Sequence, residues 1–217
     1  MTTKKRVAIL ISGRGSNLRA LVEAARAPGY PAEIVAVISN RPEAKGLAWA
    51  KEQGIPAHVL DHTLFKSREH FEAQLGALLG SARADLVALA GFMRIMTPEF
   101  VESWRDRMLN IHPSLLPAFR GLKTHERALH AGVRITGCTV HLVRPEMDEG
   151  PILGQAAVPV TEGDTPETLA ARVLEAEHRL YPHVLALLAK DQIKVNGDVV
   201  KIFAPAAEGT ALFSPGL

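Results

Sequence analysis

The stretch Val7–Leu18, VAILISGRGSNL, decides the fold expected for this 217-residue chain. Its first five residues, Val7–Ile11, are all apolar, as in a strand that is buried on both faces of a parallel sheet. Two glycines follow at Gly13 and Gly15, and a helical pattern begins near Asn17. A strand that turns through glycines into a helix is the first unit of an α/β fold, and such a loop can surround an anion with backbone N–H groups.

The same alternation of short apolar runs and longer helical patterns continues to about residue 104. It predicts a mostly parallel central sheet that is flanked by helices. Ser67 and Thr97 are suited to cap two of the helices at their N-termini. We expect strands at Val7–Ile11, Ile34–Ile38, Ala57–Leu60 and Leu86–Ala90, and helices near Asn17–Arg26, Glu43–Gln53, Arg68–Leu79 and Pro98–Trp104.

After about residue 132 the pattern changes to an antiparallel arrangement. Two strand-like runs are joined by Arg144–Pro151, which predicts a hairpin with an enlarged loop. A long helix is expected from Thr165 to about Ala189, with a kink at Pro182. The tail from Ala204 onward is predicted to be loose. The hairpin strands are expected at Ile135–Val143 and Ile152–Val160, and a second hairpin is formed by Ile193–Val195 and Val199–Ile202 on either side of Asn196-Gly197.

The composition indicates a globular protein of the cytoplasm. Hydrophobic residues make up 47% and charged residues 22% of the chain, which is enough to bury a sizeable core. The net charge is only +2 and the basic residues are scattered, so we expect no nucleic-acid partner and no membrane surface. The single cysteine, Cys138, fits a reducing compartment. Neither a signal peptide nor an apolar run of ~20 residues is visible.

The loop Ser12–Leu18 predicts a phosphate site. A dinucleotide fingerprint would require a glycine where Leu18 stands and an acid where Ser39-Asn40-Arg41 follows the second strand. A Gly-Lys-Ser/Thr triplet for a nucleoside triphosphate is also absent. A phosphomonoester therefore fits better than NAD or ATP. NADP, with Arg41 on its 2′-phosphate, is the alternative, and a simple tight turn is the plainest reading.

A second stretch, Leu109–Pro117 (LNIHPSLLP), carries an amide and an imidazole at the end of a strand. Asn110 and His112 are two residues apart, so both side chains point to the same face of the sheet. Pro113 ends the strand, which places the pair at the carboxyl edge where α/β sheets bind ligands. An amide donor beside an imidazole suits oxyanion stabilisation and proton transfer at a carbonyl. The alternative is a pair of satisfied polar groups that pack a loop.

Acidic partners for this pair are expected in the hairpin loop and in the long helix. The loop offers Glu146, Asp148 and Glu149, and the spacing alone does not choose among them. Glu177 lies on the apolar stripe of the long helix and therefore needs a partner or a ligand, with a buried ion pair as the alternative. No metal site is convincing, because no metal-binding motif is present.

Taken in order, these motifs resemble the folate-dependent formyltransferases over most of the chain, from about Val7 to Tyr181. The Ser-Gly-x-Gly-Ser-Asn loop resembles the branch of that family that acts on glycinamide ribonucleotide. The resemblance implies a single Rossmann-like formyltransferase domain over residues 1–217. Its parts would be a phosphate-binding half (about 6–110), a folate-binding and catalytic half (about 111–190), and a C-terminal hairpin and tail (191–217). The matching segments are ILISGRGSNL (Ile9–Leu18), AGFMRI (Ala90–Ile95), LNIHPSLLP (Leu109–Pro117), MDEGPI (Met147–Ile152) and EH (Glu177-His178).

The resemblance implies a reaction of de novo purine biosynthesis in which the amine of glycinamide ribonucleotide attacks the formyl carbonyl of 10-formyltetrahydrofolate. Asn110 and His112 would stabilise the tetrahedral oxyanion, His112 would carry the proton, and Asp148 would assist the proton transfer. The two small molecules would be the partners of a monomer or homodimer. The folate would be a co-substrate, with no metal and no tightly bound cofactor.

The resemblance also implies the binding residues. Gly15, Ser16 and Asn17 would hold the substrate phosphate, and Glu177 the substrate hydroxyls or amine end. Leu174 stands where some relatives have a polar substrate contact. The folate site would consist of Arg68, Met93, Arg94, Ile95, Met96, Asn110, Arg144, Pro145, Glu146, Met147 and Asp148.

Three other functions are alternatives to this one. A formyltetrahydrofolate hydrolase would carry an additional N-terminal regulatory domain, for which the residues before Arg6 leave no room. A methionyl-tRNA formyltransferase would need a further C-terminal domain and a basic face for RNA. A non-catalytic NADP- or folate-binding module would leave Asn110, His112 and Asp148 without a role.

Overall fold

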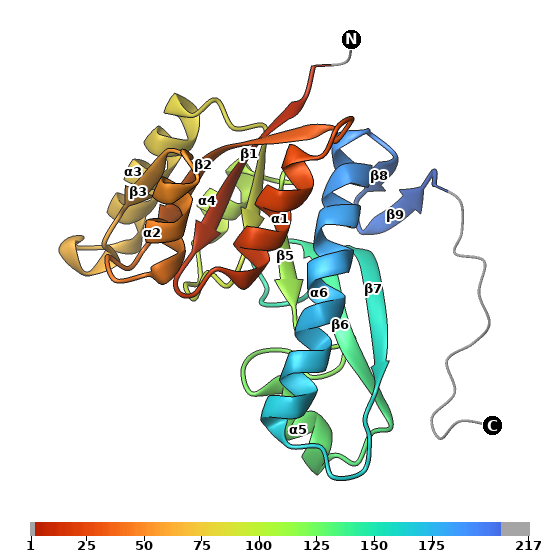
Figure 1. The fold of residues 1–217 in the computed structure, drawn as a ribbon. Helices are drawn as coiled ribbons and strands as arrows, with labels where there is room; N and C mark the ends of the chain where they lie inside the picture. The colour runs from red at the N-terminus through yellow and green to blue at the C-terminus, as the bar shows by residue number, and fades with distance from the viewer. Residues whose placement is uncertain (1–2, 205–217) are drawn as a thin grey trace.

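The computed structural model describes residues 3–204 and shows a central seven-stranded sheet covered by helices (Figure 1). The strand order is β3-β2-β1-β4-β5-β6-β7. Neighbouring strands are parallel from β3 to β5, and β6 and β7 each pair antiparallel to the strand before. The strands are β1 (Lys5–Ile11), β2 (Ala32–Ser39), β3 (Ala57–Val59), β4 (Leu86–Leu89), β5 (Met108–His112), β6 (Ile135–Leu142) and β7 (Ile152–Pro159).

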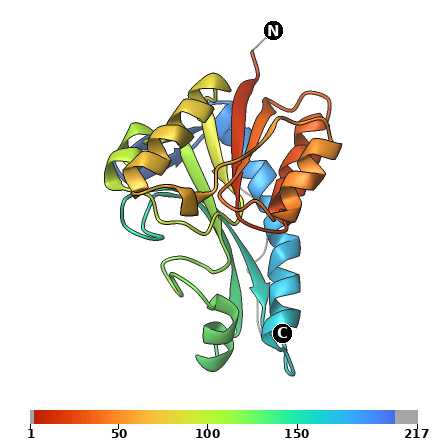
Figure 2. The same ribbon diagram turned by 90° about the vertical axis from the view of Figure 1, so that its left-hand side faces the viewer.

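Helices cover both faces of the sheet, as Figure 2 shows edge-on. On one face, α1, α2 and α6 enclose one apolar cluster, and on the other face α3 and α4 enclose a second. The predicted α/β class with a mostly parallel sheet and a C-terminal antiparallel hairpin is therefore confirmed. The helices are α1 (Ser16–Arg26), α2 (Lys45–Glu52), α3 (Arg68–Ser81), α4 (Pro98–Ser103), α5 (Thr124–His130) and α6 (Pro166–Ala189), with a 3-10 turn η1 (His62–Leu64).

The helix starts follow the sequence signals. The Ser67 hydroxyl accepts a hydrogen bond from the His70 N–H, and the Thr97 hydroxyl accepts one from the Phe100 N–H, both at 3.3 Å. Both predicted caps are confirmed. The long helix α6 begins after Thr165 and continues through Pro182, where a kink was expected. The helix α5 was not predicted; it lies in the connection between β5 and β6.

The second predicted hairpin is also present, as the separate two-stranded sheet of β8 (Ile193–Asn196) and β9 (Val199–Ile202). Because Asn196 pairs with Val199, the turn residues are Gly197 and Asp198, one position later than the Asn-Gly pair suggests. Gly197 takes the left-handed conformation at the first turn position, with φ 61°. The tail predicted to be loose lies, beyond Ala204, outside the described residues.

The strand order places the topological switch point of the sheet between β1 and β4. The chain passes from β3 at one edge of the sheet back to β4 beside β1, so the helices that follow β1 and β4 cover opposite faces. Ligands of open α/β sheets bind at such a switch point, outside the carboxyl ends of the strands. The strand β5 extends past the end of β4, from Asn110 opposite Leu89 to His112. Both stretches that carry candidate site residues therefore reach the same edge.

Tyr181 of α6 connects this helix to strands β4 and β5. Its ring is fully buried, and its hydroxyl lies 3.0 Å from the Leu89 and Leu109 carbonyl oxygens, to which it can donate. Tyr181→Phe keeps the ring but removes the hydroxyl that donates to these buried carbonyls in addition to their partners in the sheet. We expect the free energy of unfolding to fall by about 1–3 kcal/mol, measured by urea denaturation. A change below about 0.5 kcal/mol would show that the hydroxyl does not hold the two strands.

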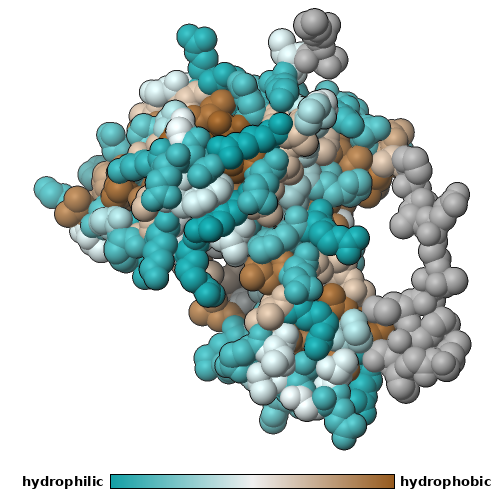
Figure 3. All heavy atoms as spheres, viewed as in Figure 1, coloured by the Kyte–Doolittle hydropathy of each residue, from teal (hydrophilic) through white to brown (hydrophobic). Residues whose placement is uncertain are grey.

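The surface on the side of α1, α2 and α6 is mostly hydrophilic (Figure 3). Within residues 3–204, no helix combines the length and the apolar character that crossing a membrane requires. Among the described residues, four of the exposed large hydrophobic side chains surround one cavity: Met93, Ile95, Leu122 and Met147.

Candidate active site

A cavity of about 600 Å³ opens at the carboxyl ends of β4 and β5. Its walls come from the loops around residues 91–96, 121–125 and 143–148, and its floor includes Asn110 and His112. Met93, Ile95, Leu122 and Met147 line the walls and are each more than half exposed. An apolar rim around a few polar groups is typical of a site for a partly apolar small molecule.

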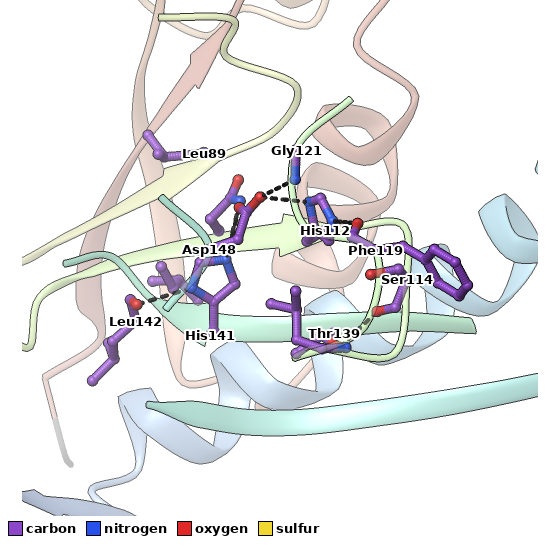
Figure 4. A network of polar contacts seen from close by, with 12 residues as sticks. Leu89, His112, Ser114, Phe119, Gly121, Thr139, His141, Leu142 and Asp148 are labelled. Carbon is purple, nitrogen blue, oxygen red and sulfur yellow. Dashed lines mark hydrogen bonds and ion pairs between the residues drawn. The ribbon is translucent and has the colours of Figure 1, made fainter. Parts of the chain in front are cut away.

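Three of the predicted residues meet at the floor of this cavity. Asn110 and His112 project from the same face of β5, as their spacing predicts. Asp148, from the loop between β6 and β7, places its Oδ2 3.5 Å from His112 Nδ1. Figure 4 shows His112, His141 and Asp148 turned toward one another. Of the three acids that the loop offered, the structure selects Asp148 by geometry, whereas Glu149 forms an ion pair with Arg120.

The Asp148 carboxylate is held by the main chain around it. Its Oδ2 accepts a hydrogen bond of 2.8 Å from the Gly121 N–H, and its own backbone is left-handed, with φ 58°. Two residues later, a Cβ on Gly150 would lie 1.7 Å from the Leu142 carbonyl oxygen, so only glycine fits there. The close approach of loop and strand fixes the carboxylate at the cavity floor.

The contacts of His112 indicate which ring nitrogen carries the proton. Its Nε2 lies 3.0 Å from the Phe119 carbonyl oxygen, which can only accept, so Nε2 is protonated. The segment that returns Phe119 to this position is closed by the Ser114 hydroxyl, which donates to the Ala118 carbonyl at 2.6 Å. Nδ1 is therefore the nitrogen that can gain or lose a proton, and it is the one that faces Asp148.

His141 of β6 completes the group and was not predicted. Its Nδ1 donates to the Leu142 carbonyl oxygen at 2.9 Å, which leaves Nε2 as an acceptor for the Asn110 amide at 3.2 Å. Nε2 also lies 3.8 Å from Asp148 Oδ1. Burial lowers the pKa of His141, although the Leu142 carbonyl and the Asp148 charge oppose this effect. A neutral His141 thus orients the Asn110 amide and leaves its second N–H free for a ligand.

The glycine loop forms a separate part of the site at the end of β1. Gly15 precedes α1 with φ 75°, and no side chain caps the helix or places an acid in its first turn. A Cβ on Gly15 would lie 3.1 Å from the Gly46 Cα, so the loop packs closely against α2. The first N–H groups of a helix have no intrahelical acceptor. Those of Gly15, Ser16 and Asn17 are thus suited to an anion.

Glu177 of α6 reaches this loop. Its Oε2 accepts a hydrogen bond of 2.7 Å from the Asn17 amide, so its buried partner is neutral and the ion pair considered from the sequence is wrong. Burial raises the pKa of Glu177, while the bond to Asn17 opposes the rise. Asn17 Oδ1 is buried and has no hydrogen-bond partner among residues 3–204, which leaves an acceptor beside the glycine loop.

Only some of the other predicted site residues line the cavity. The segments Met93–Met96 and Arg144–Asp148 line the cavity, although the Arg144 guanidinium is buried in an ion pair of 2.6 Å with Asp106. Arg68 is exposed at the start of α3 and does not line the cavity. Cys138 is buried in β6, where burial raises the pKa of its thiol to about 12. Residues 3–204 contain no group of three or more His, Cys, Asp or Glu suited to a metal ion.

This fold and this group of residues define a class of protein. The family model described as "Formyl transferase" matches residues 5–185, and the chain belongs to that family. The family resemblance seen in the sequence is confirmed. Among its relatives is the phosphoribosylglycinamide formyltransferase of Escherichia coli (strain K12), with 43% identity over 190 residues, covering 88% of this chain and 90% of that protein.

A solved structure and a longer relative support the same placement. The crystal structure of phosphoribosylglycinamide formyltransferase from Brucella melitensis is 56% identical, with a TM-score of 0.83, and the match covers 86% of this chain and 96% of that one. The trifunctional purine biosynthetic protein adenosine-3 of Bos taurus is 50% identical over 192 residues, covering 88% of this chain and 19% of that protein. The chain thus spans about a fifth of the length of that trifunctional relative.

Proposed function

We propose that this chain transfers the formyl group of 10-formyltetrahydrofolate to the amine of glycinamide ribonucleotide, the reaction of phosphoribosylglycinamide formyltransferases, in the cytoplasm. The observation that carries the proposal is the meeting of Asn110, His112 and Asp148 at the floor of a cavity with apolar walls. The glycine loop that suits a phosphomonoester lies at the same sheet edge. The folate is a co-substrate, and no tightly bound cofactor takes part.

The two substrates occupy different parts of the edge. The pteridine and the ring next to it lie in the cavity between Met93–Met96 and Arg144–Asp148, with the formyl group toward Asn110 and His112. The phosphate of the ribonucleotide is held by the N–H groups of Gly15, Ser16 and Asn17, and Glu177 binds its hydroxyls or amine end. The glycine loop thus lies in the first half of the chain (about 6–110) and His112 and Asp148 in the second (about 111–190), while Met93–Met96 of the first half contact the folate and Glu177 of the second half binds the ribonucleotide.

The reaction proceeds by direct attack of the amine on the formyl carbon. As the amine attacks, its nitrogen gives a proton to the neutral His112 Nδ1 and the carbonyl electron pair moves to oxygen, so that the Asn110 N–H and the imidazolium stabilise the oxyanion that results. The carbonyl then re-forms, and the bond to folate N10 breaks as His112 passes the proton to N10. His112 Nδ1 carries the proton between these atoms, and the Asp148 carboxylate stabilises the imidazolium that forms.

The experiment that tests the proposal measures loss of the formyl group from 10-formyltetrahydrofolate spectroscopically. The first assay contains glycinamide ribonucleotide as the acceptor, and the second contains its 5′-dephosphorylated form. The third contains no acceptor. We expect fast transfer in the first assay only. Equal loss of the formyl group without an acceptor would instead indicate a hydrolase, and an intact folate in all three would indicate a binding module. Equal transfer to the dephosphorylated acceptor would remove the phosphate role of the glycine loop.

His141→Ala is expected to lower kcat about 10- to 100-fold, because the Asn110 amide loses the acceptor that orients it. The KM for the ribonucleotide should change little, since its phosphate lies at the glycine loop. Steady-state kinetics checks this, with His58→Ala, an exposed histidine of β3, as the matched control. An unchanged kcat would mean that Asn110 is oriented without His141.

A further inference from the structure

The carboxyl ends of β1 and β4 are held together beyond the sheet itself. Main-chain hydrogen bonds run from the Ala90 N–H to the Leu10 carbonyl (2.9 Å) and from the Ser12 N–H to the Gly91 carbonyl (3.1 Å). The chain then turns at Gly91, with φ 76°. Past this turn the Met93 N–H donates to the Ser12 hydroxyl at 2.8 Å. A side chain thus continues the connection where main-chain pairing stops.

The same hydroxyl also reaches the end of β2. Ser12 Oγ donates to Asn40 Oδ1 at 2.5 Å, and Asn40, just after β2, is 1% exposed. The Asn40 carbonyl in turn accepts from His62 Nδ1 at 2.9 Å, which fixes the Asn40 backbone. One buried hydroxyl therefore links the ends of β2, β1 and β4, through one donated and one accepted hydrogen bond.

Two segments of the site begin at the hydrogen bonds of Ser12. The glycine loop, residues 13–17, follows Ser12 directly, and the cavity wall Met93–Met96 starts at the amide that Ser12 holds. The far end of this wall is anchored separately, because the Thr97 N–H donates to the buried Glu72 carboxylate at 2.8 Å. Movement at Ser12 would thus shift both the glycine loop and the near end of the wall.

We propose that Ser12 is a positioning residue that sets the distance between the phosphate loop and the folate wall, so that binding of both substrates depends on its hydroxyl. Ser12 itself does not line the cavity. The inference rests on the proposed function, because that function assigns the two segments to two substrates.

The test is Ser12→Ala, with Ser39→Ala as the matched control. Ser39, the last residue of β2, is fully buried, and within residues 3–204 its hydroxyl bonds only to the main chain of Arg41 in its own turn. The Kd values of glycinamide ribonucleotide and of tetrahydrofolate are measured by calorimetry; this pair cannot react. We expect Ser12→Ala to raise both Kd values about tenfold, as for the loss of a buried hydrogen bond. The kcat at saturating substrate should stay within about threefold of that of the unaltered protein. Ser39→Ala should leave both Kd values unchanged.

A second readout does not depend on the substrates. Hydrogen exchange at the Met93 amide should become at least about tenfold faster in Ser12→Ala and stay the same in Ser39→Ala. Ser12→Cys, which replaces the hydroxyl with a larger thiol that forms only weak hydrogen bonds, should give the same pattern if the alanine variant folds poorly. Unchanged exchange at Met93, or a change in only one of the two Kd values, would overturn the inference. If the unaltered protein binds neither compound, the proposed function fails and this inference fails with it.

Discussion

Replacing His112 with alanine is expected to lower kcat by a factor of about 10²–10⁴, the range found for loss of a general acid–base group. The reason is geometric. His112 Nδ1 is the ring nitrogen that is free to exchange a proton, and the buried imidazole is fixed between the Phe119 carbonyl and Asp148. The Kd for tetrahydrofolate should stay within about threefold, because the walls of the cavity remain.

Single-turnover kinetics with both substrates checks this expectation, since it separates chemistry from product release. His130→Ala is the matched control, because this histidine is exposed at the end of α5 and lies outside the cavity. A loss of less than tenfold in His112→Ala would mean that another group, or water, carries the proton.

Asp148→Asn is expected to lower kcat by about 10²–10³ with little change in either KM. Asparagine has nearly the same shape, tolerates the left-handed backbone at this position, and can still accept the Gly121 N–H. What disappears is the negative charge 3.5 Å from His112 Nδ1. In a partly buried site, such a charge stabilises the imidazolium by a few kcal/mol, which corresponds to this loss of rate.

The control for this change is Glu149→Gln, which removes a negative charge from the next residue of the same loop but is exposed and paired with Arg120. Its kcat should stay within about twofold. If both variants lose rate to the same degree, the loop acts through its overall charge rather than through the Asp148 carboxylate. Normal turnover in Asp148→Asn would take Asp148 out of the proton transfer.

Much of the fold could be predicted from local patterns. The apolar runs of the parallel strands and the caps at Ser67 and Thr97 are local features, and the structure follows them. The orientation of Asn110 and His112 was also predictable, because it depends only on the two-residue repeat of a strand. The position of the glycine loop at the end of β1 was predictable too, because its glycines directly follow an apolar run in the sequence.

The rest of the site depends on register between distant segments. His141 meets Asn110 only because β6 pairs antiparallel with β5 in one register, which no pattern within β6 reveals. The only signal was a lone histidine in an otherwise uncharged strand. Asp148 was one of three acids, and the choice was made by the Gly121 N–H and the close packing at Gly150. The roles implied for Arg68, Glu177 and the other binding residues stay predictions.

The position of α6 in the chain has a consequence for how the protein is made. Glu177 and Tyr181 are one helical turn apart, and they reach Asn17 and the carbonyls of Leu89 and Leu109. The Asn17–Glu177 contact spans 160 residues. Synthesis therefore has to continue for 160 residues beyond Asn17 before the glycine loop can meet the Glu177 carboxylate. Until then the nascent protein carries the glycine loop and β5 without the helix that joins them, and these parts of the site cannot take their final arrangement.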